Sequence, residues 1–301
     1  MDCENKKLSG TIVKLIGGIY FVDVSDSVYE CTARGAFRNK NISPCCGDKA
    51  VIEICDDGRG VITDILERKN EIVRPPMANL DNLILVCSTC EPPPNLLLLD
   101  KFIAVAEFKK INPIIVFTKT DIKSSDDLTK LYEKCGVEVY GIGKDSADAM
   151  NKLKKRISAE VSAFTGNTGV GKTTLLNGMF PQLGEKTAEI SRKLGRGRHT
   201  TRHVSLHKLP MGGYIADTPG FSSFDTNKYD IILKDELADC FREFRPYFGK
   251  CRYADCSHTK ESGCAVIEAV NRGDICRSRH NSYVSMYEEA KLIPEWLYKK
   301  R

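Results

Sequence analysis

The chain of 301 residues changes its pattern twice, and these changes predict a multidomain protein with three parts. Short strands separated by turns come first, strands that alternate with helices follow, and helical patterns interrupted by cysteine and histidine come last. We therefore expect an N-terminal OB-fold β-barrel at residues 1–70, a central α/β domain at residues 71–225 and a C-terminal, mostly helical domain at residues 226–301. At roughly 100–200 residues per domain, the length fits two or three domains.

The first part contains about five short strands in some sixty residues, which is typical of a small barrel. Gly17-Gly18 separates the first two strands and indicates a hairpin. Pro44, Gly47-Asp48 and Asp57-Gly58 mark the later turns. The expected strands cover residues 11–15, 19–24, 28–34, 49–54 and 60–66.

The central part alternates between strands and helices, which predicts a mostly parallel sheet with helices on both faces. Asn95 is the expected N-cap of the first helix, because its side chain can accept a hydrogen bond from a free backbone N–H. The expected strands are 83–87, 114–117, 137–140, 160–164 and 214–216. The expected helices are 95–110, 125–135, 146–157 and one that begins at residue 172.

The composition, with 42% hydrophobic and 28% charged residues, excludes wholesale disorder. No apolar run approaches the 18 or so residues that span a bilayer, and the N-terminus lacks a secretion signal. We therefore expect a cytoplasmic, monomeric protein without a membrane partner. The 13 cysteines, an odd number in such a chain, favour free thiols or metal ligands over disulfides.

One segment matches the phosphate-binding pattern G-x-x-x-x-G-K-[ST] and lies between an expected strand and an expected helix. Its glycines allow backbone N–H groups to surround phosphate oxygens at the start of the helix. Lys172 is expected to reach the β- and γ-phosphates and act in catalysis, and Thr173 is expected to bind Mg²⁺. The predicted phosphate-binding residues are Gly166, Asn167, Thr168, Gly169, Val170, Gly171, Lys172, Thr173 and Thr174.

Two further elements accompany this loop. Asp217-Thr218-Pro219-Gly220 follows a short expected strand, so Asp217 could hold Mg²⁺ through water while Gly220 senses the γ-phosphate. Thr118, Lys119 and Asp121 form the pattern T-K-x-D, in which the two carboxylate oxygens of Asp121 match the paired N–H donors of guanine. Together the three elements predict a site for GTP with Mg²⁺.

The order of these elements is unusual, because the guanine element precedes the phosphate loop by about 50 residues, whereas ordinary GTPases place it last. The elements can still assemble in the same way if the domain is circularly permuted, since domain termini often lie close together. Residues 141–144 fall where a loop that closes over the base is expected, although they match its usual sequence poorly.

Cys251, Cys256, His258 and Cys264 lie close together in the last part and predict one closed, structural zinc site with three thiolates and one imidazole. The pair Cys87 and Cys90 is a rival motif, but it has no second pair at ligand spacing, so we expect buried core thiols there. Cys45 and Cys46 are expected in a turn of the barrel. His199, His203 and His207 recur every four positions, yet the strand-like residues 204–206 argue against a helical metal face.

These motifs, in this order and with these flanking parts, resemble the small ribosomal subunit-dependent GTPase A family of bacterial ribosome biogenesis GTPases. Two departures stand out: Thr168, Thr173 and Thr174 replace serines of the family's phosphate loop, and His280 replaces a more common tyrosine. The resemblance implies slow GTP hydrolysis stimulated by the small (30S) subunit, rRNA binding by the OB-fold and a role in late subunit maturation.

The resemblance also identifies residues 195–201 as the switch I motif and His199 as a catalytic candidate. Phe221 occupies the position where Ras-like GTPases carry a water-orienting glutamine, so low intrinsic turnover is expected. His199 could orient or activate water instead, while Thr200 or Thr201 would bind Mg²⁺. These residues lie in a stretch, 192–208, with six Lys/Arg and no acidic residue, which suits a solvated loop or an RNA contact.

Three alternatives remain open at this point. A permuted GTPase that acts on the large subunit would lack the pairing of barrel and zinc domain. An RNA-binding adaptor with a degenerate nucleotide site is disfavoured by Lys172, Thr173 and Asp217. An ATPase is disfavoured by Asp121.

Overall fold

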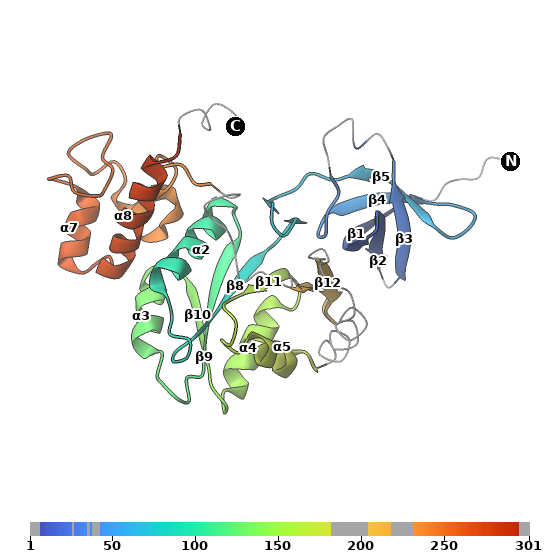
Figure 1. Cartoon of the computed structure of the whole chain (residues 1–301), viewed down its shortest axis with the longest axis horizontal. Coiled ribbons are helices and arrows are strands. Elements are labelled where there is room, and N and C mark those ends of the chain that lie inside the picture. The colour runs from blue at the N-terminus through green and yellow to red at the C-terminus, as the bar shows by residue number, and fades with distance from the viewer. Residues whose placement is uncertain are drawn as a thin grey trace. The chain divides into compact units, whose positions relative to one another are not determined.

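The computed structural model describes most of the chain, namely residues 7–25, 27–34, 37, 43–181, 204–217 and 231–294 (Figure 1). The chain divides into two compact units, each built from several segments. The first comprises Met1–Asn82, Lys152–Phe164 and Thr173–Ser223. The second comprises Leu83–Asn151, Thr165–Lys172 and Phe224–Arg301. None of the described helices is long and apolar enough to cross a membrane.

Five strands of the first unit form the barrel that the sequence predicts (Figure 1). Their order is β1-β2-β3-β5-β4, and pairing between β1 and β4 closes the barrel. Ile12, Val22, Ile52 and Ile62 fill its interior and are fully buried. The strands are β1 (Lys7–Ile16), β2 (Ile19–Val24), β3 (Ser27–Ala33), β4 (Lys49–Ile54) and β5 (Gly60–Ile65).

The first unit also contains three strands that come later in the sequence: β11 (Val161–Thr165), β12 (Ser205–Lys208) and β13 (Tyr214–Asp217). Strand β11 runs parallel to β13, as expected, whereas β12 is antiparallel to β13 and to β1. Residues 204–206 are strand-like in the sequence, and the structure places strand β12 one residue later at its start and two residues further at its end. A two-stranded ribbon of β6 (Glu71–Ile72) and β7 (Met77–Ala78) follows the barrel along the chain.

The second unit contains the strands β8 (Asn82–Ser88), β9 (Asn112–Thr118) and β10 (Glu138–Ile142), in the order β10-β9-β8. Strands β9 and β10 are parallel, as the alternating pattern predicts. Helix α2 (Leu96–Phe108) begins at Asn95, whose side chain accepts a hydrogen bond of 3.0 Å from the N–H of Leu98, so the predicted cap is confirmed. Helix α3 (Asp126–Lys134) lies between β9 and β10 in the sequence, and α4 (Ala147–Ile157) follows β10.

The C-terminal part of the second unit is helical around the cysteine and histidine residues. It consists of the 3-10 helices η1 (Ala238–Cys240) and η2 (Arg242–Tyr247) and the helices α7 (Ala265–Arg272) and α8 (Arg277–Lys291). Helix α8 packs against α2 (Figure 1). The expectation of a mostly helical C-terminal part is confirmed.

A buried ionic network joins α8 to α2. Arg279 is 1% exposed, and its guanidinium donates to Asp100 of α2 at 2.7 Å and to Glu243 of η2 at 2.8 Å. The hydroxyl of Tyr132 in α3 donates to the same Asp100 oxygen at 3.0 Å. Burial raises the pKa of Asp100 and the charge of Arg279 lowers it, so the carboxylate depends on this partner. The network therefore holds the C-terminal helices to α2 and α3 of the same unit.

We expect Arg279→Met to lower the free energy of unfolding of this unit by about 3–5 kcal/mol, because the carboxylates of Asp100 and Glu243 would stay buried without a counter-charge. Urea denaturation measures this change. Arg277→Met is the matched control, since Arg277 lies on the same helix but is exposed and contacts only Asn271 among the interactions described. Equal stability of the two variants would contradict the role given to the network.

Candidate functional site

The phosphate loop has the strand, turn and helix context that its pattern predicts. Strand β11 ends at Thr165, and helix α5 (Lys172–Met179) begins directly after the loop. Gly166 has a φ of +154°, and a Cβ at this position would lie 2.3 Å from the carbonyl oxygen of Val86. Gly171 has a φ of +91°, a conformation that favours glycine. The backbone therefore requires glycine at both glycine positions of the pattern G-x-x-x-x-G-K-[ST].

Lys172 extends back over the loop from the first position of α5. Its amine donates to the carbonyl oxygen of Gly166 at 3.5 Å, and its side chain is half-buried. Thr173 and Thr174 follow in the first turn of the helix and are exposed. A cation over the loop and hydroxyls at the helix start are the groups that a nucleotide with Mg²⁺ requires.

The guanine element contacts the phosphate loop, as the permuted arrangement predicts. The hydroxyl of Thr118, the last residue of β9, donates to the carbonyl oxygen of Val170 at 2.5 Å, although the two residues are 52 positions apart. A Cβ on Gly171 would lie 3.6 Å from the same hydroxyl oxygen. Thr118 is buried, so this contact fixes the two elements beside each other.

Lys119 and Asp121 are held by neighbouring loops. The backbone of Lys119 has a φ of +59°, its carbonyl accepts from the hydroxyl of Thr89 at 3.0 Å, and its amine donates to the carbonyl oxygen of Glu91. The exposed carboxylate of Asp121 accepts from the backbone N–H of Lys144 at 3.3 Å. Residues 141–144 thus close over Asp121, at the place expected from the sequence.

The positioning roles of Thr89, Glu91 and Lys144 were not predicted. Glu91 and Lys144 contribute backbone groups, which leave no residue signature in a sequence. The hydroxyl of Thr89 donates to the carbonyl oxygen of Lys119, which lies 30 positions later in the sequence. Only the fold brings these groups to the guanine element.

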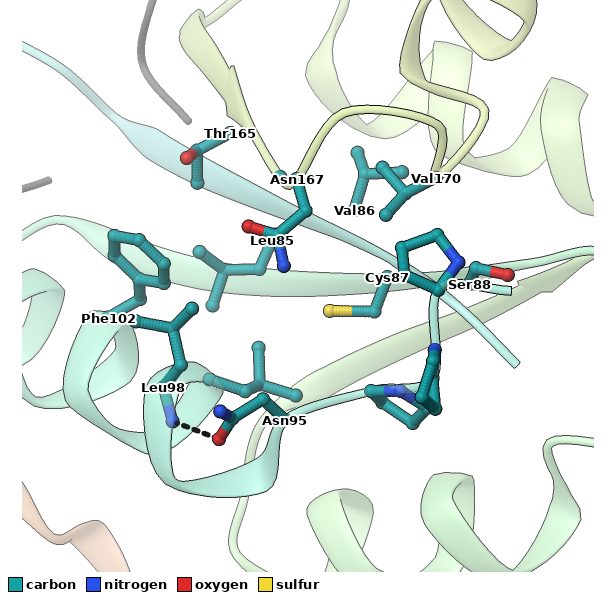
Figure 2. A pocket seen from close by; sticks show the side chains of 15 residues that line it. Leu85, Val86, Cys87, Ser88, Asn95, Leu98, Phe102, Thr165, Asn167 and Val170 are labelled. Carbon is teal, nitrogen blue, oxygen red and sulfur yellow. Dashed lines mark hydrogen bonds between the residues drawn. The ribbon is translucent and has the colours of Figure 1, made fainter. Parts of the chain in front are cut away.

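A small pocket of about 30 Å³ lies beside the start of the phosphate loop (Figure 2). Its lining is mainly apolar and comes from the end of β8, the start of α2 and the loop residues Gly166, Asn167 and Val170. Figure 2 shows the sulfur of Cys87 directed into the pocket. Burial raises the pKa of this thiol to about 12, so it stays protonated near neutral pH.

The expectation that Cys87 and Cys90 are buried core thiols is wrong, because both are only half-buried. Cys87 ends up at the pocket since it lies near the open carboxyl end of β8, where the sheet gives way to loops. Cys90 lies beyond the strand, and hydrogen bonds from the backbone of Glu91 and from Ser88 lower the pKa of its thiol. Cys45 and Cys46 are buried next to the turn that leads into β4.

The four residues of the predicted zinc site come together in the second unit. Their ligand atoms all lie within 4.8 Å of one another. The Nδ1 atom of His258 is 3.6 Å from the Sγ of Cys251 and 3.4 Å from the Sγ of Cys264, and the two sulfurs are 3.9 Å apart. Within the described ranges, this is the one group of three or more Cys, His or acidic side chains suited to a metal ion.

The chemistry of these donors fits Zn²⁺. Burial lowers the pKa of His258, which favours the neutral imidazole that binds metal. Burial and the neighbouring thiols raise the pKa of Cys256 to about 12, so three clustered thiolates need a cation to stabilise them. All four positions are occupied by protein donors, which is typical of a structural site.

Side chains that the sequence did not single out as ligands or supports hold the loop, among them Tyr283, whose hydroxyl donates to the carbonyl oxygen of Ser257 at 2.7 Å. His280 of α8 contacts the carbonyl oxygen of His258 through Nε2 at 2.8 Å. Glu261 accepts from the backbone N–H groups of Ser257 and Thr259 at 2.9 and 3.0 Å. Burial opposes ionisation of Glu261, but a hydrogen bond from the Ser257 hydroxyl and others from backbone N–H groups outweigh it and lower its pKa to about 2. The glutamate therefore stays charged and braces the loop.

Several predicted site residues lie outside the described part of the chain. These are His199, Thr200, Thr201, Gly220 and, with them, His203 and Phe221. Asp217 is the last residue of β13, at the strand end that the sequence predicts. His207 lies in strand β12, which agrees with the argument against a helical metal face.

The phosphate loop at the start of a helix, the T-K-x-D element in contact with it and their inverted order define a P-loop GTPase with a circularly permuted domain. A family model described as RsgA GTPase matches residues 65–227, and one described as RsgA N-terminal domain matches residues 9–62. The chain belongs to the RsgA GTPase family, which confirms the resemblance seen in the sequence.

Similar proteins cover nearly the whole chain. The small ribosomal subunit biogenesis GTPase RsgA of Caldanaerobacter subterraneus subsp. tengcongensis is 41% identical over 98% of this chain and 99% of its own. The protein of the same name from Halalkalibacterium halodurans is 42% identical over 94% of this chain and 97% of its own.

Two solved structures share the fold. The first, YloQ, a circularly permuted GTPase, has a TM-score of 0.79 and 32% identity and covers 97% of this chain and 98% of its own. YjeQ from Thermotoga maritima has a TM-score of 0.80 and 30% identity, with 96% of this chain and all of its own covered. The description of YloQ as circularly permuted agrees with the order of the motifs in this chain.

Proposed function

We propose that this protein binds the small ribosomal subunit, assists its late maturation and hydrolyses GTP to GDP and phosphate, with hydrolysis stimulated by the subunit. The contact between Thr118 and Val170 carries the nucleotide part of the proposal, because it joins a guanine element to a phosphate loop. The names of the full-length relatives carry the ribosomal part. We expect the protein to act as a cytoplasmic monomer.

In the proposed site, Thr118, Lys119 and Asp121 bind guanine, and residues 166–174 bind the phosphates. Asp121 accepts two hydrogen bonds from the base, and Lys172 neutralises charge on the β- and γ-phosphates. Thr173, Asp217 and either Thr200 or Thr201 would hold Mg²⁺, which supplies further charge neutralisation on the phosphate oxygens. Gly220 would contact the γ-phosphate through its backbone N–H.

His199 is the proposed group that orients or activates the attacking water. The position after Gly220 is Phe221, and an aromatic ring cannot hold a water by hydrogen bonds. We propose that binding to the subunit brings His199 to the γ-phosphate. The barrel and the zinc-binding part, with Cys251, Cys256, His258 and Cys264 as zinc ligands, would contact rRNA.

One experiment tests the proposed function: the purified protein is given GTP or ATP, and the rate of hydrolysis is measured with small subunits, with large subunits or with neither. We expect hydrolysis of GTP and not ATP, with an increase only on addition of small subunits. Stimulation by large subunits instead would assign the protein to large-subunit assembly. Nucleotide binding without hydrolysis under any condition would identify an RNA-binding adaptor.

His199→Ala is expected to reduce the subunit-stimulated rate of GTP hydrolysis by roughly 10²-fold, the lower end of what a positioned acid–base group contributes. Single-turnover hydrolysis with saturating small subunits measures this rate. His203→Ala is the matched control from the same basic stretch and is expected to retain stimulation. Full stimulation of the His199 variant would exclude histidine from the water-activating role.

A further inference from the structure

The barrel holds the strand pair β12–β13 at several points, all within the first compact unit. Lys14 of β1 pairs with Ser205 of β12 in antiparallel register. The buried thiol of Cys46 donates to the carbonyl oxygen of Val204 at 3.2 Å. These contacts connect the barrel to the start of β12.

A buried carboxylate from the barrel binds the other half of the strand pair. Asp23 of β2 is 5% exposed, and its Oδ2 atom accepts from the hydroxyl of Tyr214 at 2.6 Å. The amine of Lys208 lies 3.1 Å from the same oxygen and also donates to the carbonyl oxygen of Ser25. Burial is the main cause that raises the pKa of Tyr214 to about 12, and the hydrogen bond to the Asp23 carboxylate raises it further. The hydroxyl therefore remains a donor near neutral pH. Asp23 thus fixes the last residue of β12 and the first residue of β13 together.

This strand pair connects two parts of the proposed GTPase machinery along the chain. Strand β12 begins four positions after Thr201, and β13 ends at Asp217. The pair belongs to the same compact unit as the barrel, whereas the guanine element and Gly166–Lys172 belong to the other. The strand that ends in the proposed Mg²⁺ carboxylate is therefore attached to the barrel through the buried Asp23, which pairs with the exposed amine of Lys208 and accepts from the buried hydroxyl of Tyr214.

We propose that Asp23 is a positioning residue for the Mg²⁺–GTP site: through Lys208 and Tyr214, the barrel sets the register of β12–β13 and so the place of Asp217. The inference rests on the proposed function, since it takes Asp217 as the carboxylate that holds Mg²⁺. Charge-assisted hydrogen bonds of this kind impose a defined geometry, which a purely apolar contact would not.

The test measures binding of a fluorescent, non-hydrolysable GTP analogue to the full chain as Mg²⁺ is titrated. In Asp23→Asn and in Tyr214→Phe, we expect the Mg²⁺ concentration at half-maximal binding to rise by about 10-fold. This is the lower end of the loss of metal affinity that follows when groups that orient metal ligands are replaced. Binding of GDP without Mg²⁺ is expected to stay unchanged, because the guanine element is not touched. Asp64→Asn is the matched control, an exposed barrel carboxylate that accepts only from its neighbour's N–H among the described contacts.

An unchanged Mg²⁺ midpoint in both variants would overturn the proposal, as would an equal shift in Asp64→Asn. If Asp23→Asn fails to fold, as judged by its thermal unfolding, Tyr214→Phe decides alone, because it removes a single hydroxyl and keeps the ion pair. The readout requires neither hydrolysis nor ribosomes. Failure of the proposed function in the hydrolysis experiment is therefore seen separately from failure of this inference.

Discussion

Replacing Asp121 by asparagine is expected to lower the affinity for GTP by at least about 10³-fold, because a site built to bind a donor pair strongly rejects a mismatched partner. Guanine presents two N–H donors along one edge, and a carboxylate offers an acceptor oxygen to each. Asparagine keeps one acceptor and turns the other group into a donor, which would face a guanine donor. Lys144 holds Asp121 through its backbone N–H, so the side chain cannot simply turn away.

The same variant is expected to gain affinity for xanthosine triphosphate. Xanthine has a carbonyl oxygen where guanine has its amino group, so an amide matches its donor and acceptor pattern. Titration with fluorescent guanine and xanthine nucleotides measures both changes. Asp127→Asn, an exposed acidic residue in the first turn of α3, is the control and is expected to bind GTP normally. Retained GTP affinity in Asp121→Asn would rule out the T-K-x-D segment as the guanine element.

Local signals explain why much of the fold could be predicted from the sequence. Asn95 caps α2 through a bond to a residue three positions away, and the glycine pair after β1 marks a hairpin whose partner strand follows at once. The phosphate loop is a continuous segment whose residue types are dictated by its backbone. The proximity of the guanine element to the phosphate loop was also predictable, because both motifs are expected to bind parts of one nucleotide, whereas the particular contact of Thr118 with Val170 was not predicted.

Contacts without such a motif could not be predicted. Arg279 and Asp100 are 179 positions apart, and Asp23 and Tyr214 are 191 positions apart. In the sequence each is an ordinary charged or aromatic residue, and only burial in the folded chain gives it a specific partner. The full extent of β12 also depends on the fold, because β1 and β13 supply hydrogen-bonding edges on both sides of its four residues.

Removal of the proposed zinc ion is expected to unfold the Cys/His loop while leaving the proposed nucleotide site intact. Structural zinc contributes roughly 10–16 kcal/mol of apparent binding free energy in zinc-finger peptides, and this energy is coupled to folding. Without a cation, three thiols and His258 within 4.8 Å of one another are not a stable cluster, and the contacts from Glu261, His280 and Tyr283 do not replace the metal. We therefore expect Cys251→Ser, or treatment with a strong chelator, to make residues 248–264 sensitive to protease.

The ion pair between Arg279 and Asp100 does not involve the metal, so α8 is expected to stay on α2 after the loop unfolds. Because the contact between α8 and α2 is independent of the metal, three results are expected together. Zinc content should fall from one equivalent per chain to almost none, cleavage should be confined to the loop, and GTP affinity should not change. Cys276→Ser, which alters a half-buried thiol outside the cluster, is expected to keep its zinc. Full zinc content in Cys251→Ser would mean that the loop is held by other ligands, whereas loss of GTP binding would mean that the metal stabilises the whole second unit.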